Sequence, residues 1–111
     1  MPRDSRIYLE DILEATRKIT AYTGSQSKAA FLEDEKTIDA VVRNLEVIGE
    51  AVKKLPENLR AKHSAVVWKK IAGLRDILIH EYFGLDAEIV WDIVQNKVPA
   101  LDREVRTMLN E

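Results

Sequence analysis

The segment KTIDAVVRNLEVIGEAVKKLP, residues 36–56, decides the fold. Its apolar residues recur every three or four positions, which places them along one face of an α-helix. These are Ile38, Val41, Leu45, Ile48, Val52 and Leu55. Pro56 follows the last of them and is expected to end the helix, because proline cannot donate a helical hydrogen bond.

The same periodicity extends to both sides of this segment. Residues 5–24 predict a helix that ends at Gly24, with an apolar face made of Tyr8, Ile12, Ala15, Ile19 and Tyr22. A further stripe runs toward Gly84 and consists of Val67, Ile71, Leu74 and Leu78. Residues 85–111 predict a last helix, capped by Asp86 and kinked at Pro99.

The connections at 25–35 and 57–67 are polar, with room for a helical turn in each. His63 lies in the second connection between Lys62 and Ser64 and is expected at the surface. With 111 residues, the chain is predicted to be a single domain, 1–111. The predicted fold class is all-α, an antiparallel up-and-down bundle of four to five helices.

Composition limits the possible functions. The sequence has no cysteine, which excludes disulfides, cysteine metal sites and thiol catalysis. It has no apolar run long enough to span a bilayer, and MPRDSRIYLED at the start lacks the apolar core of a signal peptide, so a cytoplasmic protein is expected. The net charge of −2 argues against a strongly basic nucleic-acid binder. Residues 43–75 nevertheless carry eight Lys or Arg against three acids, which predicts either solvated helix faces or a positive surface for phosphates.

The stretch LRDILIHEYFG, residues 74–84, places polar side chains in an apolar run. Arg75 and Tyr82 are seven residues apart and share a face of an ideal helix, whereas His80 lies about 140° round from Arg75. Arg75 and His80 therefore cannot converge from one straight helix. Either the helix loosens before Gly84, or two copies of it meet in a symmetric dimer and pool their residues.

These residue types suit metal-free RNA cleavage. Arginine binds phosphate through paired hydrogen bonds, histidine transfers protons near neutral pH, and tyrosine can bind phosphate, stack on a base or accept a covalent group. The sequence has no clustered acidic motif for a metal, which fits this chemistry. A structural role is the alternative: Arg75 and His80 can cap the helix end, Asp76 can pair with His80, and Tyr82 can lie in the core.

The chain resembles the HepT-type HEPN toxins of HEPN/MNT toxin–antitoxin pairs. The resemblance covers 39–56, 66–86 and 90–105, and the family's R-x4-H-x-Y motif falls on Arg75, His80 and Tyr82. It implies a homodimer with the motif helices at the interface, acting as a metal-independent endoribonuclease on tRNA or mRNA. Arg75 and His80 would be catalytic, with no cofactor and no metal site in the chain itself.

The resemblance also implies a partner, an MNT nucleotidyltransferase antitoxin that uses ATP and Mg²⁺ to transfer AMP to Tyr82. Asp76 departs from the family, where Asn often follows the motif arginine, and its carboxylate could pair with Arg75 or His80 or repel a phosphate. Arg43, Asn44 and Asp76 are predicted to contact RNA, although Arg43 is equally placed to pair with a glutamate on its own helix.

Two other functions remain open at this point. One is a non-catalytic HEPN module that binds nucleotide or scaffolds a nucleotidyltransferase, which the low net charge favours because RNA affinity depends on phosphate neutralisation. The other is a helical dimer with only a structural role.

Overall fold

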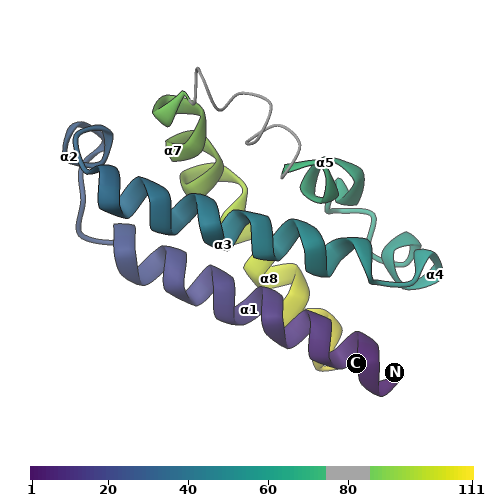
Figure 1. Cartoon of the computed structure of the whole chain (residues 1–111). Coiled ribbons are helices and arrows are strands. Elements are labelled where there is room, and N and C mark those ends of the chain that lie inside the picture. Colours follow the sequence, from purple (N-terminus) through teal and green to yellow (C-terminus); the bar gives the residue numbers. More distant parts are fainter. Residues whose placement is uncertain (75–85) are drawn as a thin grey trace.

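The computed structural model describes residues 1–74 and 86–111, and all its regular elements are helices. Two long antiparallel helices, α1 (Arg3–Thr23) and α3 (Glu35–Lys53), lie side by side along the molecule (Figure 1). Behind them, α7 (Ala87–Asn96) packs against the one-turn helix α2 (Lys28–Leu32), and α8 (Val98–Leu109) packs against α1. The short helices α4 (Glu57–Ala61) and α5 (Trp68–Ala72) follow the end of α3.

This arrangement confirms the predicted all-helical bundle. The two chain ends lie at the same end of the molecule in Figure 1, where Arg6 Nη1 of α1 donates to the Leu109 carbonyl oxygen of α8 at 3.4 Å. Among the described residues, no helix combines the length and the apolarity that crossing a membrane requires.

The apolar face predicted for α3 is confirmed, since all six of its residues are buried in the core. The helix begins after Asp34, whose side-chain Oδ1 accepts a hydrogen bond from the Thr37 backbone N–H at 3.1 Å. Phe31 of α2 is fully buried as well and packs its ring 5.1 Å from that of Trp91 in α7. Thus α2 closes one end of the core.

The face predicted for α1 was wrong at its far end. Tyr22 is 43% exposed, whereas Leu9, Thr16 and Thr23 are buried. The Thr23 hydroxyl donates to the Ile19 carbonyl at 2.8 Å, and Thr16 Oγ1 lies 2.7 Å from Asp102 Oδ2 of α8. Threonine is tolerated on the buried face because both hydroxyls are hydrogen-bonded.

Two further details differ from the sequence prediction. Val67 is 58% exposed because it lies in non-helical backbone immediately before α5. The last helix is divided at Lys97 into α7 and α8, so the kink expected at Pro99 is a full break. Pro99 lies in the first turn of α8, where a backbone N–H would have no partner within the helix, so its absence costs no hydrogen bond. Asp86 caps α7 as predicted, and its Oδ1 accepts from the Glu88 N–H at 2.9 Å.

Candidate functional site

The motif residues Arg75, Asp76, His80 and Tyr82 lie outside the described part of the chain. Their positions in space therefore remain predictions. The motif segment is joined to α5 on its N-terminal side and to α7 on its C-terminal side.

On the N-terminal side, α5 is anchored to the core. Trp68, Ile71 and Leu74 are buried, and α5 packs against α3. The indole Nε1–H of Trp68 donates to the His63 carbonyl oxygen at 2.9 Å. On the C-terminal side, the capped start of α7 follows directly after the motif segment. Both ends of the motif segment therefore join elements that are packed into the same bundle.

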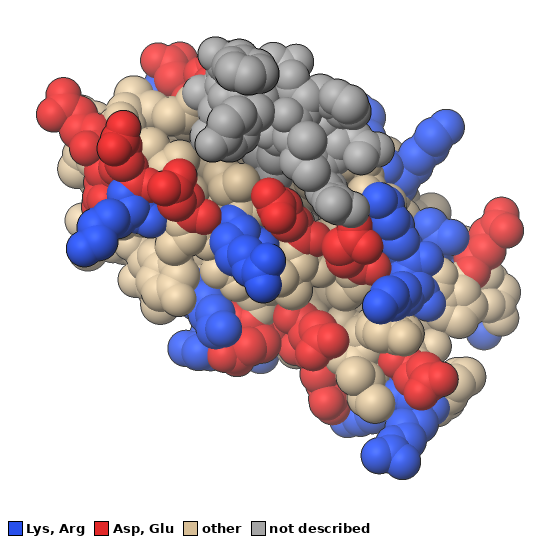
Figure 2. Space-filling view, viewed as in Figure 1, with Lys and Arg blue, Asp and Glu red and all other residues tan. Residues whose placement is uncertain are grey.

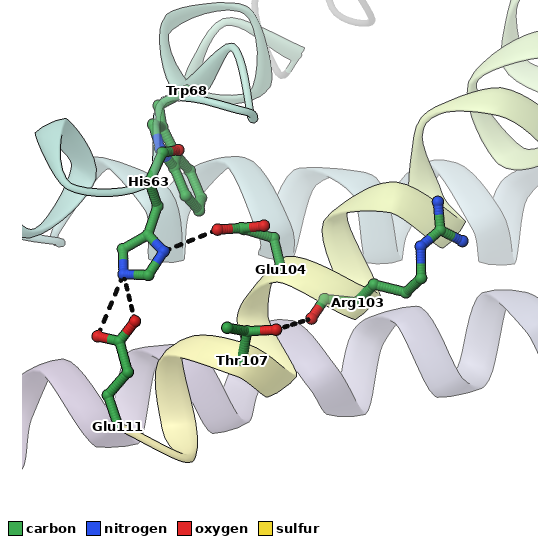
Figure 3. A network of polar contacts seen from close by, with 6 residues as sticks. All are labelled: His63, Trp68, Arg103, Glu104, Thr107 and Glu111. Atoms are coloured by element: carbon green, nitrogen blue, oxygen red, sulfur yellow. Dashed lines mark hydrogen bonds and ion pairs between the residues drawn. The ribbon is translucent and has the colours of Figure 1, made fainter.

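His63 was wrongly expected at the surface. It is only 7% exposed, and each ring nitrogen faces a carboxylate. Nδ1 lies 2.7 Å from Glu104 of α8, and Nε2 lies 3.1 Å from Glu111 after the end of α8 (Figure 3). Arg103 points away from the imidazole in the same view. The network joins the α4–α5 connection to α8. The local sequence could not have predicted it, because the two carboxylates follow His63 by 41 and 48 residues.

Of the residues predicted to contact RNA, Arg43 and Asn44 differ in their exposure to solvent. Arg43 is exposed on α3, whereas Asn44 is buried and its side-chain amide donates to the Ala40 carbonyl at 2.8 Å. Within the described chain Arg43 forms no ion pair with Glu46 or with any other carboxylate, so that alternative is not realised there.

Arg43 borders a surface hollow of about 420 Å³ between α1 and α3. Its lining has mixed charge: the basic Arg43 and Lys54, with three acids, Asp11, Glu46 and Glu50. Lys54 Nζ lies 5.5 Å from the centre of the Tyr8 ring. Figure 2 shows the same mixture, with blue and red side chains interspersed over this face of the molecule. Phosphate groups would meet nearby carboxylates here, so the hollow is not a basic site.

The described residues offer no metal centre, since they contain no group of three or more His, Asp or Glu placed to hold an ion. In the described part of the chain, three ionisable groups have displaced pKa values. The hydrogen bond with Arg17 lowers the pKa of the Glu14 carboxyl and raises that of the Arg17 guanidinium. The Thr37 hydroxyl and N–H lower the pKa of Asp34. All three groups belong to surface pairs or caps of α1 and α3, and none borders the motif in sequence.

The chain is similar in sequence to several proteins that are named as ribonucleases. "Putative RNase MJ0127" of Methanocaldococcus jannaschii is 50% identical, over 100% of this chain and 93% of its own length. "Putative RNase TTE0752" of Caldanaerobacter subterraneus subsp. tengcongensis is 44% identical over 96% of this chain and 95% of its own. "Probable ribonuclease HepT" of Thermococcus cleftensis is 43% identical over 91% and 92%. No solved structure shows a significant match. The model of the family described as "Ribonuclease HepT-like" matches residues 12–108, so the chain belongs to the HepT-like ribonuclease family.

Proposed function

We propose that the chain is a metal-independent endoribonuclease and the toxin of a toxin–antitoxin pair. The observation that carries this proposal is the family match over residues 12–108, which includes the complete R-x4-H-x-Y motif at Arg75, His80 and Tyr82. The helical bundle supports the proposal, because it anchors both ends of the motif segment.

In the proposed reaction, His80 takes the proton of a ribose 2′-hydroxyl. The 2′-oxygen then attacks the adjacent phosphorus, and the bond from phosphorus to the 5′-oxygen of the next nucleotide breaks. That 5′-oxygen leaves with the proton that His80 had taken, and the products are a 2′,3′-cyclic phosphate and a 5′-hydroxyl. Arg75 orients the phosphate and stabilises the charge that develops on it.

A homodimer completes this site. Arg75 and His80 are five positions apart, about 140° round an ideal helix, so one straight helix cannot direct both at one phosphate. Two motif segments facing each other across a two-fold axis would supply an Arg75 from one protomer and a His80 from its partner.

Tyr82 is the proposed point of control. An MNT nucleotidyltransferase partner would transfer AMP from ATP to the Tyr82 hydroxyl, forming a phosphodiester and releasing pyrophosphate. The added nucleotide would occupy the RNA site and repel substrate phosphates.

The test joins RNA cleavage with intact mass. Unmodified wild type and His80→Ala are incubated with total RNA in excess EDTA, after thermal unfolding has shown that both are folded. Cleavage by wild type alone supports the proposal. Intact RNA in both samples, with no mass adduct on the wild type, would overturn it in favour of the non-catalytic HEPN module.

The second arm adds the nucleotidyltransferase partner with ATP and Mg²⁺. A mass gain of one or more AMP units with loss of cutting supports the control by Tyr82, and Tyr82→Phe should abolish the gain. Tyr22→Phe is the matched control, because Tyr22 is an exposed tyrosine on α1 that should leave the gain unchanged. Equal AMP addition to Tyr82→Phe would exclude Tyr82 as the modified residue.

A further inference from the structure

A second hollow, of about 440 Å³, lies between α5 and the junction of α7 with α8. One wall comes from residues 65–74, in and beside α5, and the other from residues 93–101, on both sides of the break at Lys97. Its volume falls within the range of about 300–1,000 Å³ that is typical of ligand sites. Most of its described lining is apolar and includes Val67, the most exposed large apolar side chain of the described chain.

The charges around this hollow differ from those around Arg43. Among the described lining residues only Lys70, Asn96 and Lys97 are polar, and none is acidic. Neither lysine forms an ion pair with a carboxylate of the described chain. The side-chain amide nitrogen of Asn96 donates to Asp92 Oδ1 at 2.5 Å, so the Asn96 side-chain oxygen is left to accept a hydrogen bond. An apolar lining with one lysine from each of its two chain segments, neither of them in a described ion pair, suits a ligand with an apolar face and negative charges beside it.

The hollow also adjoins the motif along the chain. Leu74 lines it, and the next residue is Arg75. A chain of nucleotides has the required pattern, because each flat base is flanked by two phosphates, and single-stranded RNA can turn a base out of the stack.

We propose that this hollow is a nucleotide-binding subsite for single-stranded RNA. One unstacked base lies on the apolar floor, and the phosphates on either side of it contact Lys70 and Lys97. The inference rests on the proposed function, since it makes the ligand the substrate of the motif residues. It also accounts for how a chain of net charge −2 attracts RNA: the described lining of the hollow carries two lysines and no carboxylate, and the neighbouring Asp92 is hydrogen-bonded to Asn96.

The test measures RNA binding without cutting. The full-length protein is titrated with a fluorescent 2′-O-methyl single-stranded RNA, which lacks the attacking hydroxyl, and anisotropy is recorded over a range of salt concentrations in EDTA. The double variant Lys70→Gln/Lys97→Gln is compared with Lys18→Gln/Lys36→Gln. The control pair lies on α1 and α3 away from the hollow, forms no ion pair in the described chain and changes the net charge equally.

Each phosphate contact in a single strand contributes about 0.7 to the slope of log K against log salt. Loss of two contacts should therefore lower the slope by about 1.4 and weaken binding about 25-fold near 0.1 M salt. A third variant, Ala100→Asp, places a carboxylate at an exposed lining position in the first turn of α8, where Asp suits the helix dipole, and should weaken binding while Lys70 and Lys97 are intact.

The inference is overturned if Lys70→Gln/Lys97→Gln and the control bind the RNA equally. Fluorescent poly-glutamate is titrated in the same way as a second anionic ligand. If Lys70→Gln/Lys97→Gln binds poly-glutamate more weakly than the control does but binds the RNA equally well, the inference is overturned and the hollow is assigned to an acidic polypeptide. Failure of the proposed function looks different, because the wild type would then leave natural RNA uncut in EDTA while its binding of the 2′-O-methyl RNA still depended on Lys70 and Lys97.

Discussion

Replacing His63 by leucine should destabilise the bundle strongly. The imidazole is 7% exposed between Glu104, which is 23% exposed, and Glu111, which is 49% exposed. His63→Leu keeps an apolar side chain in the space but removes both ring nitrogens. Glu104 then loses a hydrogen-bond partner at 2.7 Å in a place where water reaches it poorly.

The two contacts differ in expected strength. A hydrogen bond to a charged group contributes about 1.5–3 kcal/mol, which applies to Glu104 because it is mostly buried. The contact with the half-exposed Glu111 at 3.1 Å is a surface pair, worth about 0–1 kcal/mol. His63→Leu should therefore lower the free energy of unfolding by about 1.5–4 kcal/mol, and the Tm by about 6–16 °C at about 4 °C per kcal/mol for a domain of this size.

The assay is urea unfolding followed by circular dichroism, at one fixed protein concentration because dimerisation would add to the apparent stability. Glu111→Gln is the control and should cost less than about 1 kcal/mol. The double variant His63→Leu/Glu104→Leu should recover part of the loss, since replacing both partners removes the unpaired carboxylate. An unfolding free energy of His63→Leu within about 0.5 kcal/mol of wild type would show that the network does not stabilise the fold.

Three other substitutions test separate parts of the fold. Asp34→Asn keeps a capping side chain but removes a carboxylate whose pKa is lowered by the Thr37 hydroxyl and N–H. The stability that the ionised carboxylate contributes is present above its unfolded-state pKa and is lost as the pH falls through its folded-state pKa. The Tm difference between Asp34→Asn and wild type should therefore shrink on acidification, and a constant difference would contradict this. Leu45→Ala, at a fully buried position of α3, should cost about 3–5 kcal/mol in urea unfolding, whereas the half-exposed Ile89→Ala should cost far less, and similar losses would refute the assigned core. Pro99→Ala should change the free energy of unfolding by less than about 1 kcal/mol in the same urea assay, because the first turn of α8 needs no N–H from this residue; a larger loss would mean that the proline ring holds α7 and α8 apart.

Prediction from the sequence worked best where periodicity was strong. All six residues predicted for the α3 face are buried, because they are branched aliphatics at helical spacing and a proline follows them. The α1 face was predicted less well because two threonines, Thr16 and Thr23, take core positions. Their hydroxyls are satisfied by groups that the pattern cannot reveal, in one case by Asp102 of α8.

The candidate site divides in the same way. The motif at Arg75, His80 and Tyr82 is local in sequence and was recognised directly, whereas its spatial arrangement lies outside the described residues. Arg43 and Asn44 were identified as a pair, but neighbouring positions on a helix point about 100° apart, so one is exposed and the other buried.

By itself, the sequence determined the helical class, the main core face, the cap at Asp86 and the family motif. Each of these depends on residues within a few positions of one another. Only the tertiary structure decided that His63 is buried between Glu104 and Glu111, and that Lys70 and Lys97 border one hollow. Those pairings join α8 or its junction with α7 to the region around α5, because helix packing brings together side chains that no local periodicity relates.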